Sequence, residues 1–223
     1  MALESHKTRG LGPEGTETIE HLQVWWAQNY RIVLGVVAGA AVIVAALVFN
    51  RRTQAVQEDQ AAGKLAEANV YFWQNDYARS LELAKQVYAQ YGSTPSGLEA
   101  HRLAGDDAFW NGDFKGAIAE YQRYLGRMKK GILADAARRS LAYALESDGQ
   151  TLEAAKTFEQ LVGTFDRASS AEFLMAAARC YRTLSQPAEA IGRLKRVDLE
   201  FGETSYAQAA RVELGELAAS ATR

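Results

Sequence analysis

The chain has 223 residues, and its apolar fraction of 48% is enough to form a folded core. Its 25 lysines and arginines are balanced by 27 aspartates and glutamates, so the bulk charge argues against a nucleic-acid-binding protein, which needs a net basic face. Only three prolines occur among many alanines, leucines and glutamates, which favours an all-α protein over a sheet protein or a disordered one.

The N-terminal segment is predicted to contain a tail and a short helix. Residues 1–15 are polar, and their Gly10–Gly15 stretch matches GxGxxG literally. A dinucleotide site would need a strand before this stretch and a packed helix after it, and neither pattern is present. Residues 16–31 carry apolar side chains at helical spacing, including Leu22 and Trp26. We predict an amphipathic helix at a membrane interface.

Residues 32–49 are predicted to cross a membrane. They comprise eighteen apolar or small residues and no polar one, and as a helix they would extend about 27 Å, close to the ~30 Å of bilayer hydrocarbon. Trp25, Trp26 and Tyr30 stand where an aromatic belt would meet one interface. The run ends in Phe49-Asn50-Arg51-Arg52, unlike a signal-peptide cleavage site. A buried helix of a soluble protein would not carry these flanking charges and tryptophans.

Small residues recur along the apolar segment. This spacing would let a second membrane helix approach closely, although Gly and Ala are frequent in any membrane helix. The predicted packing positions are Gly35, Gly39, Ala41 and Ala45. Residues 50–59 are predicted to continue as a linker or helix extension.

Basic residues leave the membrane orientation open. Within about twenty residues of the apolar segment, Arg31 lies on the N-terminal side, whereas Arg51, Arg52 and Lys64 lie on the other, which favours a cytoplasmic C-terminal part. Counting Lys7 and Arg9 in the tail gives three basic residues on each side.

Four similar segments follow, beginning at Asp76, Asp113, Gln150 and Gln186, that is, 37, 37 and 36 residues apart. Each is expected to begin the second helix of a helix-turn-helix pair. Small residues form two columns twelve residues apart, as required where antiparallel helices cross closely. The columns contain Ala68, Gly105, Ala142 and Ala178, and then Ser80, Ala117, Ala154 and Ala190.

This pattern resembles the tetratricopeptide repeat, a helix-turn-helix unit of 34 residues. It departs from that family early in each first helix, where the expected tryptophan is replaced by Lys64, His101, Arg138 and Leu174. Pro95 is the nearest survivor of the proline that closes each unit. The resemblance implies a superhelix of four repeats at residues 60–203, with a capping helix and tail at 204–223. The predicted fold is therefore all-α, with the transmembrane helix preceding this superhelix.

The sequence contains no motif for catalysis, metal binding or cofactor binding. HExxH, CxxC, GxSxG and Walker patterns do not occur, so we predict no catalytic residue, no metal site, no cofactor and no enzymatic activity. Cys180 is interpreted as a small buried apolar residue rather than a reactive thiol. The adjacent Asp106 and Asp107 are interpreted as part of a solvated face.

The tetratricopeptide resemblance also implies a groove lined by first-helix side chains, which would contact a partner. The corresponding positions are Asn69, Phe72, Trp73, Arg102, Asp106, Phe109, Trp110, Arg139, Tyr143, Arg179 and Arg182. The Phe72-Trp73 pair recurs 37 residues later as Phe109-Trp110, so we expect the two aromatic pairs to stack one above the other. Alternatively, these rings pack against the following helix pair.

The order of an amphipathic lead, one Gly/Ala-rich anchor and divergent repeats resembles the ancillary subunit of the bacterial Sec translocon. That resemblance implies the bacterial inner membrane, repeats in the periplasm, and contacts with the translocon and periplasmic chaperones. The arginines after the anchor weaken the periplasmic assignment.

Three functional hypotheses follow from the sequence. The first is a scaffolding subunit that docks on a large inner-membrane complex (translocon, respiratory or photosynthetic) through its transmembrane helix, N-terminal tail and repeats. The second is a membrane-tethered chaperone-like or peptide-binding module, and the third a membrane enzyme or cofactor carrier. The expected partners are an integral membrane protein complex, the lipid bilayer and extrinsic or periplasmic proteins, without nucleic acid.

Overall fold

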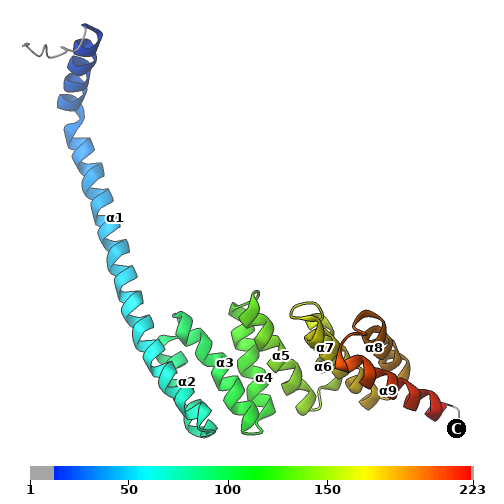
Figure 1. The fold of residues 1–223 in the computed structure, drawn as a ribbon. Helices are drawn as coiled ribbons and strands as arrows, with labels where there is room; N and C mark the ends of the chain where they lie inside the picture. The colour runs from blue at the N-terminus through cyan, green and yellow to red at the C-terminus, as the bar shows by residue number, and fades with distance from the viewer. Residues whose placement is uncertain (1–12, 222–223) are drawn as a thin grey trace, which may run out of the picture. The chain divides into compact units, whose positions relative to one another are not determined.

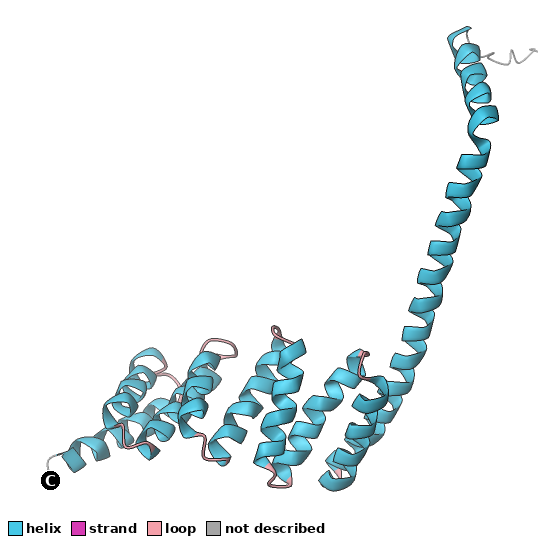
Figure 2. Ribbon diagram, turned by 180° about the vertical axis from the view of Figure 1, so that it is seen from behind, coloured by secondary structure: helices cyan, strands magenta, loops and turns pink. Residues whose placement is uncertain are grey.

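The computed structural model describes the backbone of residues 13–221 and the side chains of residues 22–219. This part of the chain contains nine α-helices and no strand, so the predicted all-α fold is confirmed (Figure 2). The chain divides into two compact units, Met1–Ala55 and Val56–Arg223.

The first unit contains most of α1 (Pro13–Trp73), which also supplies the first helix of the second unit. The expected boundaries between interfacial helix, membrane span and linker all fall within this one helix and stay predictions. The predicted tail at residues 1–15 lies largely outside the described residues. The segment Leu22–Trp73 is long and apolar enough to cross a membrane, and none of its most apolar window is buried. One such helix near the N-terminus is weak support for a span, because signal sequences share these properties.

The second unit is a row of antiparallel helix pairs, in which each helix packs against its neighbours in the chain (Figure 1). The pairs are α3 with α4, α5 with α6, and α7 with α8, followed by α9 against α8 and α7. The end of α1 forms the first pair with α2, because residues of both helices share one buried core cluster. The helices after α1 are α2 (Tyr77–Tyr91), α3 (Pro95–Trp110), α4 (Phe114–Arg127), α5 (Ile132–Ser147), α6 (Thr151–Leu161), α7 (Arg167–Thr183), α8 (Pro187–Glu200) and α9 (Ser205–Ala221).

The turn inside each pair uses the same backbone conformation. A residue in the left-handed region ends the first helix of every pair, namely Asn75 (φ 62°), Gly112 (φ 80°), Gly149 (φ 80°) and Ser185 (φ 57°). In the first turn the Asp76 N–H donates to the carbonyl of Tyr71 at 3.0 Å, and the other three turns repeat this bond. Each first helix therefore ends in a Schellman-type turn, which satisfies carbonyls that the helix leaves unpaired.

Both columns of small residues lie at helix contacts, and all eight residues are buried. Gly105 shows why size matters, because a Cβ placed there would lie 2.6 Å from the ring of Tyr121 on α4. Large side chains fill the space beside the columns and form the core, which includes Val87, Tyr124 and Leu161. Close helix crossing at small residues thus positions the stack.

The interpretation of Asp106 and Asp107 as a solvated face was wrong. Asp107 is fully buried, and burial raises its pKa to about 7, offset only in part by the Ser80 hydroxyl. Asp106 is half-buried, accepts a hydrogen bond from the Tyr121 hydroxyl at 2.7 Å, and has a pKa that burial raises despite its contact with Arg102. Both carboxyl groups therefore belong to the packing between helices.

Candidate interaction surface

Exposed aromatic side chains gather where the first two helix pairs turn. Trp73 is the last residue of α1 and Trp110 the last of α3, and their side chains are 79% and 60% exposed. Tyr77 joins them: its ring lies 5.5 Å from Phe72 and stacks on Trp110 at 6.1 Å and 17°. The aromatic cluster consists of Phe72, Trp73, Tyr77, Phe109, Trp110 and Phe114.

The arrangement inside the aromatic cluster differs from direct stacking of the two pairs. Phe72 meets Tyr77 of α2 edge-on, and Phe109 meets Phe114 of α4 edge-on at 5.5 Å. Both phenylalanines are half-buried, and each ring contacts an aromatic residue in the second helix of its own pair. Sequence reasoning overlooked Tyr77 and Phe114, although an aromatic residue after the capping aspartate recurs at the same 37-residue spacing.

The predicted groove arginines of the last two helix pairs are all ion-paired with a neighbouring helix. Arg179 of α7 donates to both carboxylate oxygens of Glu146 on α5, at 2.7 and 2.8 Å. Arg139 of α5 lies 3.2 Å from Glu172 of α7, which also accepts from the Tyr143 hydroxyl. These partly exposed pairs contribute at most about 1 kcal/mol each.

The same series continues to the capping helix, where Arg182 lies 2.8 Å from Glu213 of α9. The inter-helix ion pairs, defined as Arg139–Glu172, Arg179–Glu146 and Arg182–Glu213, therefore connect α5, α7 and α9. Because each guanidinium already has a carboxylate partner, these positions do not form a cationic groove for an acidic ligand.

The polar groove positions of the first two pairs are likewise occupied. Arg102 is shared between Glu99 and Asp106, its Nη1 lying 2.6 Å from the Asp106 carboxylate. Asn69 donates to the backbone carbonyl of Leu65 in its own helix, at 2.8 Å. These three side chains therefore stabilise local structure.

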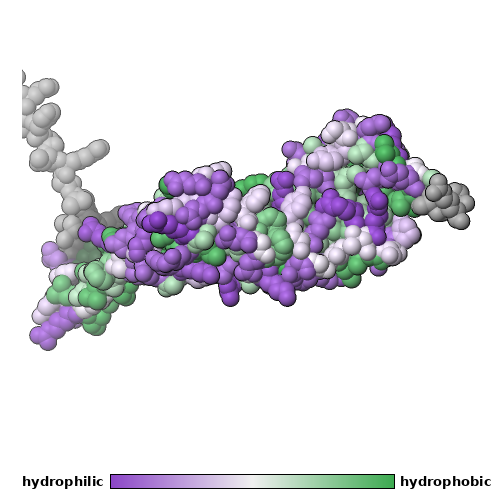
Figure 3. All heavy atoms as spheres, turned by 90° about the horizontal axis from the view of Figure 1, so that it is seen from below, coloured by the Kyte–Doolittle hydropathy of each residue, from purple (hydrophilic) through white to green (hydrophobic). Residues whose placement is uncertain are grey.

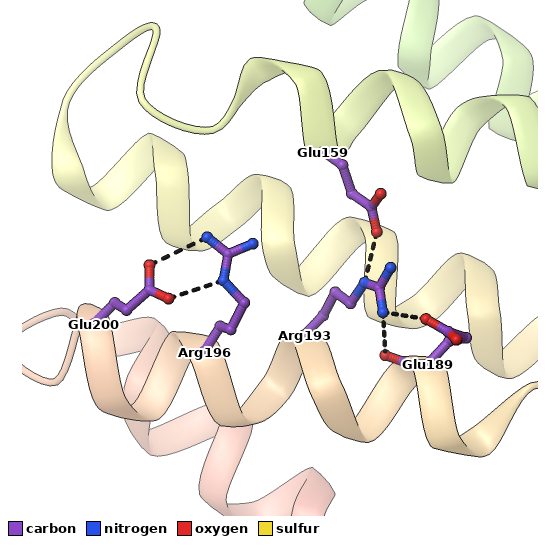
Figure 4. Close-up of polar contacts among 5 residues, drawn as sticks. All are labelled: Glu159, Glu189, Arg193, Arg196 and Glu200. Atoms are coloured by element: carbon purple, nitrogen blue, oxygen red, sulfur yellow. Dashed lines mark hydrogen bonds and ion pairs between the residues drawn. The ribbon is translucent and has the colours of Figure 1, made fainter.

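Second helices are connected by charges in a similar way. Arg193 of α8 lies 2.6 Å from Glu159 of α6 and also pairs with Glu189, while Arg196 pairs with Glu200 along the helix at 2.8 Å (Figure 4). The view from below shows a repeat unit that is mostly hydrophilic, with hydrophobic patches between the polar areas (Figure 3). Because these charged side chains already have partners within the chain, the exposed apolar areas are the surface most suited to binding another protein.

A cleft of about 250 Å³ opens between α1, α3, α4 and α5, and sequence reasoning did not find it. Its walls are mainly apolar, with two carboxylates among the lining side chains. The anchor cleft is lined by Glu58, Leu65, Pro95, Ser96, Leu98, Glu99, Tyr124, Met128 and Leu133. Among these residues only Leu65, Leu98 and Glu99 lie three or four residues from a predicted groove position on the same helix, so the signal in the repeat pattern was weak.

The predicted membrane-facing residues are uncovered in the first unit. Trp25, Trp26 and Tyr30 are exposed, and Gly35 and Gly39 have open space where a side chain would begin. A shallow apolar depression is lined by Ala40, Ala41, Val44, Ala45, Val48, Phe49 and Arg52. Their roles at a bilayer interface and in helix packing stay predictions.

Reactive groups contribute little to this surface. The described residues include no group of three metal-ligating side chains. Cys180 is buried, as expected, and burial raises the pKa of its thiol to about 12, so the nucleophilic thiolate is suppressed at neutral pH.

Comparisons with known proteins agree with this architecture. The model of the family described as "Tetratricopeptide repeat-like domain" matches residues 23–173, about two thirds of the chain. Among solved structures, the chain is similar to TPR-like repeats from Podosopora anserina, described as nearly identical repeats of a putative kinesin light chain, with a TM-score of 0.60 and 22% identity over 74% of this chain and 89% of that chain. A variant of those repeats with one substitution matches equally well. No curated protein matches.

Proposed function

Because the chain belongs to the tetratricopeptide repeat-like domain family, we propose that it is a non-enzymatic scaffolding subunit of a bacterial inner-membrane protein complex. In this proposal residues 32–49 anchor the chain in the bilayer, and the repeat unit binds partner proteins. The translocon, a respiratory complex or a photosynthetic complex would each be a suitable assembly, and we place the repeats in the periplasm.

One observation carries the proposal: a single helix, α1, contains both an uncovered apolar run and the first helix of a repeat stack. The apolar side chains of residues 32–49 would be costly in water, and a bilayer or a membrane-embedded partner removes that cost. The family match begins at residue 23, so the apolar run lies inside the matched region. One matched segment therefore contains the apolar run and most of the repeats, up to residue 173.

The small residues of the predicted membrane helix allow a specific test of the proposal. We would purify the full chain in mild detergent and quantify the proteins that co-purify with it. Replacing Gly35 and Gly39 by leucine should reduce their recovery, whereas the matched change to leucine of Val33 and Val36, which lie away from the small residues around the helix, should not. Unchanged recovery for both variants would remove helix packing from the proposal, and purification of the chain alone would remove the complex.

Protease accessibility tests the location of the repeats. Added protease should cleave the repeat unit in intact spheroplasts, because the periplasmic side is then open to solvent. Protection until the membrane is lysed would refute the periplasmic placement.

A tethered peptide-binding or chaperone-like module is the second candidate, and the exposure of Trp73 and Trp110 favours it. Replacing both tryptophans by alanine separates the two functions. Loss of client binding with normal co-purification would support the module, while unaffected binding and co-purification would exclude the aromatic cluster from either function.

A further inference from the structure

The anchor cleft is held open by contacts that do not depend on a ligand. Glu58 of α1 accepts from both the hydroxyl and the backbone N–H of Ser96, at 2.7 and 3.1 Å, and so connects α1 to the start of α3. Thr94 caps the same helix by accepting from the Gly97 N–H at 3.0 Å. Leu98 and Tyr124 pack with Ala137 in a small core at the cleft. The walls are therefore fixed in position by neighbouring structure.

The cleft has an apolar rim that nothing covers in the described part of the chain. Leu133 lines it and is 50% exposed, and the adjacent Ile132 is 64% exposed. Pro95 is also exposed. An apolar side chain entering a cleft of about 250 Å³ would bury these surfaces together with its own.

The charged groups of the cleft have one sign. Glu58 and Glu99 line it, and no lysine, arginine or histidine does. Partial burial raises the pKa of Glu58, but the hydrogen bonds from Ser96 outweigh it and hold the pKa below its ordinary value, so this group is ionised at neutral pH. Glu99 shares Arg102 with Asp106, which leaves the site with an excess of negative charge.

Met128 lines the cleft at the end of α4, and the exposed Lys129 and Lys130 follow it without lining the cleft.

We propose that the anchor cleft binds an extended segment of a partner polypeptide. In this segment an apolar side chain enters between Leu98 and Leu133, while a neighbouring lysine or arginine lies beside Glu58. This inference rests on the proposed protein-binding function and specifies the chemistry of the segment that is bound.

The probes are two labelled synthetic octapeptides, one with leucines alternating with lysines and the other with leucines alternating with glutamates. Their binding to the full chain in nanodiscs is measured by fluorescence anisotropy. The basic peptide should bind more tightly than its acidic twin, because the ammonium groups meet the carboxylates of the cleft. Equal binding, tighter binding of the acidic peptide, or no binding of either overturns the proposal.

Two pairs of variants locate the contact. L133S should weaken binding of the basic peptide roughly fivefold, whereas L152S should not, although Leu152 is also an exposed leucine in the first turn of its helix. E58Q keeps an acceptor for Ser96 but removes the charge and should also weaken binding, whereas E67Q on the exposed side of α1 should not. Equal effects within either pair would place binding elsewhere.

The proposed function and the cleft fail in different ways. If partner proteins still co-purify with the full chain but the basic peptide does not bind, the cleft inference is wrong and the scaffold remains. If the basic peptide binds at the cleft but nothing co-purifies, the complex is wrong and the binding site remains.

Discussion

The first two and the last two helix pairs share one backbone design but use different chemistry at equivalent positions. The position three residues before each left-handed turn residue is Phe72, Phe109, Glu146 and Arg182 in successive pairs. In the first two pairs this position contributes to the aromatic cluster. In the last two it belongs to the inter-helix ion pairs.

This difference separates side chains that pair with a neighbouring helix from side chains that remain exposed and could contact a partner. In the last two pairs every guanidinium at a predicted groove position has a carboxylate partner on a neighbouring first helix or on the capping helix. In the first two pairs two tryptophans remain exposed, and the anchor cleft opens between these pairs and the exposed first turn of α5. We infer that partner binding concentrates on the first two pairs and the start of α5, while the rest of the last two pairs mainly stabilises the stack.

Replacing Asp107, which lies in the first two pairs, should have the largest effect on stability, and this effect should depend on pH. The pKa of Asp107 is raised from 3.8 to about 7, so the folded chain retains a proton that the unfolded chain has released between about pH 4 and 7. Stability should therefore fall as pH rises through this window and level off above it. D107N should flatten the curve and stabilise the chain at pH 8 by on the order of 3 kcal/mol.

Urea unfolding of the full chain in detergent at pH 5 and pH 8 measures this change. The neighbouring Asp106 also has a raised pKa, so a smaller slope should remain in D107N. An unchanged slope would mean that Asp107 does not carry the pH dependence.

Gly105 should give the second largest effect. In G105A the new methyl group would meet the Tyr121 ring, which is buried and bonded to Asp106, so we expect a loss of about 2 kcal/mol. G126A is the matched control, because Gly126 lies on the exposed side of α4 with open space around it, and this change should stabilise by about 0.5 kcal/mol. Equal urea midpoints for the two variants would contradict the close crossing.

Phe109 and Glu146 allow a direct test of the comparison, because they occupy equivalent positions. F109A should cost about 2 kcal/mol and be insensitive to salt, since it removes apolar packing against Phe114. E146A should cost less than about 1 kcal/mol, and the cost should shrink at high salt because its partner Arg179 is exposed. If F109A and E146A lost the same stability and responded equally to salt, the first two and last two pairs would not differ in the chemistry of this position.

Local patterns predicted the helix pairs because each depends on residues close together in the chain. The turns, the capping residues and the two small columns all recur at 36 or 37 residues, and one repeat reinforces the next. Asp107 could also have been predicted: it aligns with Ala144 and Cys180, which are buried positions in later pairs. Taking it as solvated relied on residue type and overlooked its position in the repeat.

The candidate surfaces were harder to predict because they depend on where several helices meet. The anchor cleft combines side chains of four helices with Met128, which lies in the connection between α4 and α5. The connections between successive pairs differ in length and sequence, so the repeat pattern does not predict them. The arginines were correctly placed on first helices, but their carboxylate partners lie about 31 to 33 residues away and depend on side-chain geometry. The positions of the arginines on the helices could be predicted, but whether their guanidinium groups were free to bind a partner could not.

The turns of the last two pairs should give the smallest effect. Gly149 and Ser185 occupy the same left-handed position, but only glycine adopts it without a steric cost from Cβ. S185G should stabilise the chain by about 0.5 kcal/mol, and G149A should destabilise it by about 1 kcal/mol, both measured by urea unfolding. If both changes were neutral, the turn could adopt other conformations. The four pairs would then not share a fixed left-handed residue, and their surface positions could not be compared one by one.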